Sequence, residues 1–213
     1  MKIKSRVLIV LLICVVITIL VCNTFHREAY IRSTGENVIY DLILAYRALD
    51  RGMADGALAP SADFTEAAIL LAKVSALMST EDAINYGFDS RRSFTGSFDY
   101  TSSFILNGGE IKNSVIRPAA MINNNMTNDE KAFYSHLRDL LKEELSRFII
   151  VDEDTSIKYQ NINSYSITNL ATDFQEKSQV FEVNDGDARA MMVCNNENYS
   201  IVDAIPRLDL SPG

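Results

Sequence analysis

The sequence contains few of the residues on which most catalytic and metal sites depend. Its 213 residues include two histidines, three cysteines and no tryptophan. His26 and His136 are far apart, and no His-x-x-x-His or Cys-x-x-Cys pair is present, which argues against the common zinc sites. No Gly-x-Ser-x-Gly elbow or EF-hand loop occurs either. We therefore expect no cofactor, no metal and no enzyme activity, and only His136 remains as a candidate catalytic base.

Positive charge is also scarce, because 20 basic residues stand against 28 acidic ones and the formal net charge is −8. Three of the basic residues, Lys2, Lys4 and Arg6, lie within the first six positions, and the first acidic residue is Glu28. The rest of the chain is therefore more acidic than the whole. An acidic protein without a basic patch is a poor ligand for nucleic acid, so we expect no nucleic-acid partner.

One long apolar run, Val7 to Cys22, follows the basic residues. This order is typical of a secretory signal and of a membrane anchor whose N-terminus stays in the cytoplasm. Extended to Phe25, the run reaches the lower limit of about 17–20 residues for a membrane span. Small residues for signal cleavage are scarce, and Ile19-Leu20-Val21 does not fit the box before a lipidated cysteine. We interpret the run as a permanent anchor, with a cleaved signal or a lipoprotein leader as alternatives.

This interpretation divides the chain into a cytoplasmic foot (1–6), a transmembrane anchor (7–25), a juxtamembrane amphipathic helix (26–52) and an extracytoplasmic domain (53–213). No second apolar run of spanning length follows, so we expect a single-pass protein of the cell membrane with its C-terminal domain extracytoplasmic. That domain contains one cysteine, Cys194, and its fold must be held together without an internal disulfide.

The segment after the anchor is predicted to continue as a helix to about Arg51, with Gly35 as a candidate kink and Gly52 as the stop. Its apolar residues recur at three- and four-residue spacing: Val38, Ile39, Leu42, Ile43, Tyr46 and Leu49. We take the face formed by Val38, Leu42, Tyr46 and Leu49 as the candidate interaction site. It packs either on the chain's own head or on another chain.

Helices and strands are both predicted in the remaining domain. One helix is expected over 63–78 with Asp63 as its cap, a short turn is capped at 79–82, and another helix begins at the Thr127/Glu130 capping box. Alternating apolar residues predict strands at five places: 98–106, 157–159, 165–167, 180–193 around an Asp-Gly turn, and 199–202. The predicted fold class is α+β: a transmembrane helix continuing into a stalk helix, then a single ectodomain whose helices pack on a mainly antiparallel sheet.

The basic foot, the apolar helix that continues as an amphipathic helix, and the globular head together resemble the architecture of type IV pilin-like and Tad-type minor pilin proteins. The resemblance covers about the first fifty residues, and the prepilin cleavage pattern is missing, since Ser5-Arg6-Val7 stands there. It implies a subunit of a cell-surface assembly, with the lipid bilayer, other membrane or cell-surface proteins and further copies of the chain as partners. The alternatives are a component of a secretion or conjugation complex, a ligand-sensing ectodomain and a membrane-tethered hydrolase.

Overall fold

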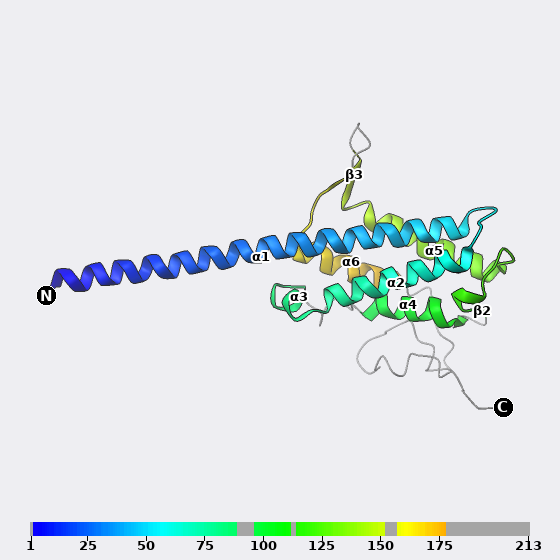
Figure 1. Cartoon of the computed structure of the whole chain (residues 1–213), viewed down its shortest axis with the longest axis horizontal. Coiled ribbons are helices and arrows are strands. Elements are labelled where there is room, and N and C mark those ends of the chain that lie inside the picture. The colour runs from blue at the N-terminus through cyan, green and yellow to red at the C-terminus, as the bar shows by residue number, and fades with distance from the viewer. Residues whose placement is uncertain (1, 89–95, 112–113, 152–156, 178–213) are drawn as a thin grey trace, which may run out of the picture.

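In the part of the chain that the structure describes, the protein is mostly helical, with one long N-terminal helix and two small antiparallel sheets (Figure 1). The computed structural model describes residues 2–88, 96–111, 114–151 and 157–177. Its helices are α1 (Lys2–Met53), α2 (Pro60–Met78), α3 (Glu81–Asn85), α4 (Gly96–Asn107), the 3₁₀ turn η1 (Ala119–Met121), α5 (Asn128–Leu145) and α6 (Ser164–Lys177). Its strands are β1 (Gly109–Ile111), β2 (Ser114–Ile116), β3 (Ile149–Val151) and β4 (Ile157–Tyr159). The strands predicted over 180–202 lie outside the described residues.

Helix α1 has two parts with different surroundings. Side chains 11–29 are exposed, and α1 projects from the head along most of this stretch, whereas Ile31 and most apolar residues beyond it are buried (Figure 1). The helix ends at Met53, close to the predicted stop, and it is unbroken at Gly35. A Cβ at Gly35 would lie 2.5 Å from Ile162 Cγ2. The glycine therefore allows Ile162 to pack closely on α1, and the predicted kink is wrong.

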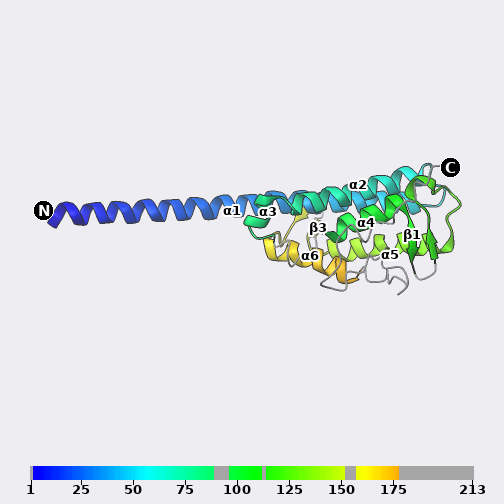
Figure 2. The same ribbon diagram turned by 90° about the horizontal axis from the view of Figure 1, so that it is seen from below.

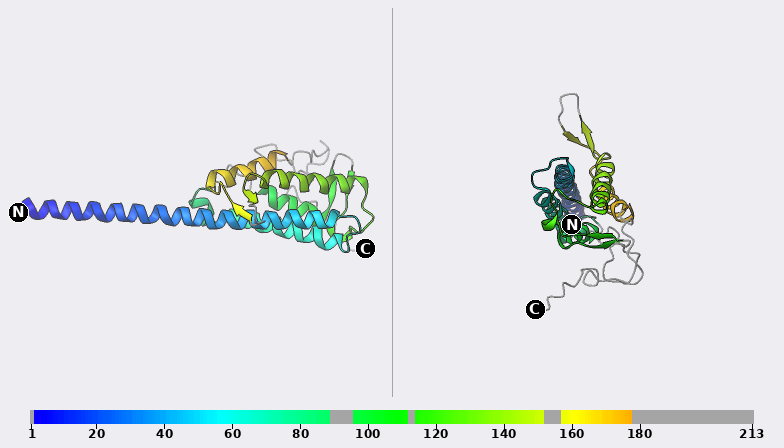
Figure 3. Two further views of the ribbon diagram at one scale, coloured as in Figure 1. Left: turned by 90° about the horizontal axis from the view of Figure 1, so that it is seen from above. Right: turned by 90° about the vertical axis from the view of Figure 1, so that its right-hand side faces the viewer.

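The second part of α1 belongs to a helical head. It packs against α2 and α5, while α4 packs on α2 and α6 packs on α5 and α4 (Figures 2 and 3). Two aromatic stacks tie these helices together. The rings of Phe64 on α2 and Tyr134 on α5 lie 3.8 Å apart, and those of Phe98 on α4 and Phe174 on α6 lie 4.6 Å apart. The core of the described part is thus formed by helices.

The helix caps explain where the head's helices begin. The predicted capping box of α5 is confirmed, because Thr127 Oγ1 accepts the Glu130 amide and Glu130 accepts the Thr127 amide. Thr80 caps α3 in the predicted segment, since its hydroxyl accepts the Ala83 amide. The predicted cap of α2 is wrong: the helix begins at Pro60, which needs no amide partner in the first turn, and Asp63 instead binds Arg51 of α1.

Two segments predicted as strands are helices. Residues 98–106 form α4, which buries Phe98, Thr101, Ser102 and Ile105 at helical spacing. Residues 165–167 open α6, where Ile167 is fully buried and Tyr165 is 74% exposed, although a strand would place both on one face. The prediction at 157–159 is confirmed as β4. The strands pair as the hairpins β1–β2 and β3–β4, so the described residues contain no larger sheet on which helices could pack.

Candidate functional site

The predicted interaction face of α1 lies inside the head. Val38, Leu42 and Leu49 are fully buried, and Tyr46 is partly buried against the same core. Asp41 on this side of α1 is 2% exposed, and its Oδ1 accepts a hydrogen bond of 2.8 Å from Lys73 of α2. The face therefore has a partner within the chain. An exchange of this face between two chains stays a prediction.

The exposed part of α1 is the first candidate functional region. Its large apolar side chains from Leu11 to Phe25 are about half to two-thirds exposed, which is costly in water. Among the residues that the structure describes, α1 is the one helix long and apolar enough to cross a membrane. The region is compatible with a membrane anchor, because a bilayer would cover this surface. Cys14 and Cys22 are free and exposed on it.

A buried ion pair holds the chain between β2 and α5. Glu130 has no exposed area, and its carboxylate accepts hydrogen bonds from Arg117 Nε at 2.6 Å, Arg117 Nη2 at 2.8 Å and the Thr127 amide at 2.8 Å. Arg117 also donates to the Asn125 carbonyl at 3.1 Å. These hydrogen bonds, from Arg117 above all, lower the pKa of Glu130 from 4.5 to about 2 against the opposing effect of burial. Both carboxylate oxygens of Glu130 accept hydrogen bonds inside the protein. The pair is therefore suited to holding the segment between β2 and α5 rather than to proton transfer.

A second charged group joins the end of α5 to α6. Lys177 Nζ lies 2.5 Å from Glu143 and 2.6 Å from Glu144, which is almost fully buried. Arg147 contacts the other oxygen of Glu144 at 3.0 Å and also binds Asp173. The hydrogen bond and charge of Lys177 lower the pKa of Glu143. Because acidic and basic groups alternate in this cluster, we interpret it as a contact that docks α6 on the end of α5.

Among the described residues, those considered for catalysis or metal binding are not gathered into a site. His136 is half-buried on α5, and His26 lies on the exposed part of α1. Within the described ranges, no three His, Cys, Asp or Glu side chains are placed to hold a metal ion. Cys194 lies outside those ranges, and so do 152–154 and 184–187, two acidic segments whose carboxylates are potential cation ligands.

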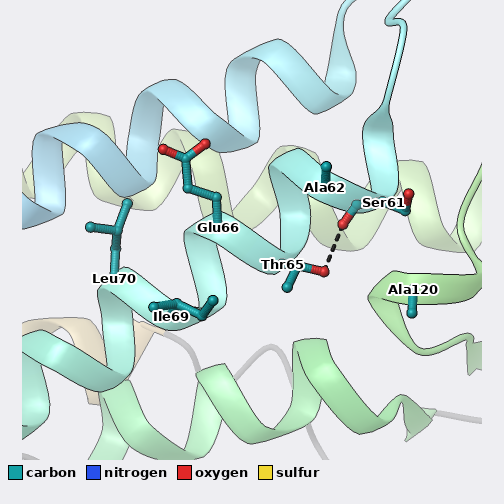
Figure 4. A pocket seen from close by; sticks show the side chains of 7 residues that line it. All are labelled: Ser61, Ala62, Thr65, Glu66, Ile69, Leu70 and Ala120. Carbon is teal, nitrogen blue, oxygen red and sulfur yellow. Dashed lines mark hydrogen bonds between the residues drawn. The ribbon is translucent and has the colours of Figure 1, made fainter.

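A shallow groove on the outer side of α2 is the second candidate region (Figure 4). It has a volume of about 520 Å³ and is lined by Ser61, Ala62, Thr65, Glu66, Ile69, Leu70 and Ala120. Its wall is mainly apolar, and Ile69 is 59% exposed. A smaller hollow that shares Ser61 continues to Leu58 at the end of the head remote from α1's exposed part. We call the surface formed by Leu58, Ala62, Ile69 and Ala120 the α2 surface.

Sequence reasoning missed the α2 surface, although one signal was available. The core stripe of α2 runs through Phe64, Ala68 and Leu71, and Ile69 falls outside it. A large β-branched residue off the core stripe of an amphipathic helix indicates an exposed apolar position. Comparisons with protein-family models, curated proteins and solved structures give no match.

Proposed function

We propose that this protein is a single-pass membrane protein that holds a helical head outside the cytoplasm and binds other proteins through it. The observation that carries the proposal is the continuity of α1. One helix supplies both the exposed apolar segment and a wall of the head's core, so no linker separates the two parts. A head fixed in this way keeps a constant orientation relative to the membrane, which suits a subunit of an assembly better than a freely moving binding domain.

The α2 surface is the proposed site for a protein partner. Its exposed Ile69 and Leu58 would bury apolar area on binding, and Ser61, Thr65 and Glu66 provide polar groups beside them. A photoreactive benzoylphenylalanine at position 69 should crosslink to a partner in intact cells. The same residue at position 131, exposed on α5, is the matched control. Equal crosslinking at both positions, or none at 69, would refute this site.

The finer proposal is a cell-surface assembly with pilin-like architecture, in which the exposed parts of α1 from several copies pack together. Cys14 and Cys22 allow a direct test after Cys194→Ser removes the remaining thiol. The two thiols are separated by about 80° around the helix, given 3.6 residues per turn. Oxidation of intact membranes by copper phenanthroline should therefore join copies through one thiol preferentially. A chain that stays monomeric would leave the anchor but refute the self-assembly.

The anchor itself is tested by the intact mass of the protein extracted from membranes. A full-length mass, together with resistance to extraction by alkaline carbonate, is expected. A shortened protein that is released freely would refute anchoring. A lipid-modified protein beginning at Cys22 would replace the helix by a lipid anchor.

A further inference from the structure

The end of the head from which α1 projects is built from three separate segments. We call it the basal surface, and it is formed by Arg27 and Tyr30 of α1, Ile84 and Tyr86 of the α3 turn, and Tyr165 at the start of α6. Figures 2 and 3 show α3 and α6 beside α1 at this end of the head.

The α3 turn is fixed to α1 by specific contacts. Arg27 Nε donates to the Tyr86 carbonyl at 3.2 Å, and the Tyr30 and Tyr86 rings lie 4.9 Å apart. The Tyr30 hydroxyl lies 3.2 Å from Thr80 Oγ1. The turn therefore stays at the level of residues 27–30 of α1.

The start of α6 reaches the same level. A Cβ at Gly87 would lie 3.1 Å from Arg27 Nη2 and 3.6 Å from Ser164 Cβ, so these three residues surround one point. Tyr165, the next residue, is 74% exposed, and Ile84 is 40% exposed. The basal surface thus carries large apolar or aromatic side chains that the head itself leaves uncovered.

The spacing along α1 relates this surface to a bilayer. Residues 7–25 rise by about 28 Å, close to the roughly 30 Å of a hydrocarbon core. The polar interface adds about 5–8 Å on each side. Arg27 and Tyr30 lie about 3 and 8 Å beyond Phe25 along the helix, which places the basal surface within that interface. Tyrosine is one of the residues that prefer this depth, because its ring is apolar and its hydroxyl is polar.

We infer that the basal surface inserts into the lipid headgroup region, so that the head stands end-on upon the membrane that holds α1. The inference rests on the proposed anchoring. The exposed charged residues in or beside the basal surface are Arg27, Glu28, Glu81 and Asp82, so acidic groups outnumber basic ones there. The contact therefore depends on aromatic and apolar side chains, and neither anionic lipid nor low salt is required.

The absence of tryptophan makes the inference directly measurable, since one introduced tryptophan is the only one in the chain. The full-length protein is reconstituted in phosphatidylcholine vesicles whose acyl chains are brominated close to the headgroup. Tyr165→Trp and Ile84→Trp report on the basal surface. Leu58→Trp is the control at the remote end, because residues 27–53 of α1 alone rise by about 39 Å. Val16→Trp reports on the anchor and is also measured with bromine near the chain ends.

Tyr165→Trp and Ile84→Trp should lose fluorescence in the brominated vesicles, with a blue-shifted maximum and no recovery in molar salt, while Leu58→Trp keeps its intensity. If Val16→Trp is quenched but either basal reporter behaves like Leu58→Trp, the basal contact is refuted and the anchor remains. Quenching of Leu58→Trp as strong as that of the basal reporters would also refute it, because the head would then lie flat. An unquenched Val16→Trp would refute the anchor and the contact together.

Discussion

The ion pair between Arg117 and Glu130 predicts a large and pH-dependent loss of stability in Glu130→Gln. The carboxylate has no exposed area and its pKa is about 2, against an ordinary value of 4.5. This difference corresponds to about 3 kcal/mol of stability at neutral pH. Arg117 is 35% exposed, so water screens part of the interaction, and we expect a cost of about 2 kcal/mol.

The sign of the pH dependence follows from the lowered pKa of Glu130. The folded protein holds this carboxylate ionised more strongly than the unfolded chain does. Its contribution is therefore complete above pH 4.5 and is lost as the pH falls toward about 2. The difference in unfolding free energy between the wild type and Glu130→Gln should shrink from about 2 kcal/mol at pH 7 to about 1 kcal/mol at pH 3.

Urea unfolding of the full-length protein in detergent micelles, followed by the helical circular dichroism signal, measures this difference. Glu66→Gln is the matched control, because Glu66 also binds an arginine, Arg51, but both side chains are about half exposed. It should cost less than about 1 kcal/mol. A cost of Glu130→Gln that equals the control, or that is unchanged between pH 7 and pH 3, would mean that the ionised Glu130 carboxylate does not stabilise the folded protein.

Three further predictions concern the packing of the head. Leu42→Ser removes a fully buried side chain and should lower the unfolding free energy by more than the roughly 2–5 kcal/mol of a Leu→Ala change. Tyr40→Ser, on the exposed side of α1, is the control and should change the unfolding free energy little in the same urea titration. A Leu42→Ser head that stays stable would mean that this face of α1 packs elsewhere. Gly52→Ala should lower the unfolding free energy by about 1–3 kcal/mol despite alanine's higher helix propensity, because the new Cβ would lie 2.7 Å from the buried Phe64 ring. A raised melting temperature of this variant would contradict the prediction. Thr127→Ala removes the cap of α5 and should cost about 1 kcal/mol in the same titration, while an unchanged midpoint would mean that the capping hydroxyl is dispensable.

Local capping signals were sufficient to predict several elements. Thr127 and Glu130 lie at the spacing that their two reciprocal hydrogen bonds require, and the structure contains both bonds. The end of α1 was predicted equally well, because Gly52 stands one residue before the helix ends at Met53. In each case the residues that determine the feature are neighbours in the sequence.

Helices α4 and α6 were mispredicted because small and polar residues share their buried faces. In α4, Thr101 and Ser102 are buried between Phe98 and Ile105, so that the helical spacing is hidden when only large apolar residues are counted. In α6, the buried residues Ile167, Leu170, Ala171 and Phe174 have helical spacing. The exposed Tyr165 stands two residues before Ile167, and this pair alone has the alternating pattern of a strand. Only the tertiary contacts determine which periodicity applies.

The sequence left open whether the amphipathic part of α1 packs on its own head, and three complementary contacts favour that arrangement. Asp41 would be a buried carboxylate without a counter-charge if Lys73 of the same chain did not bind it. Gly35 admits Ile162, and Gly52 admits Phe64, at distances that a Cβ would not permit. A partner that used this face would have to replace a lysine and two specific apolar side chains at once. It would also have to displace α2, so a partner that binds the folded head gains more from surfaces that are already exposed.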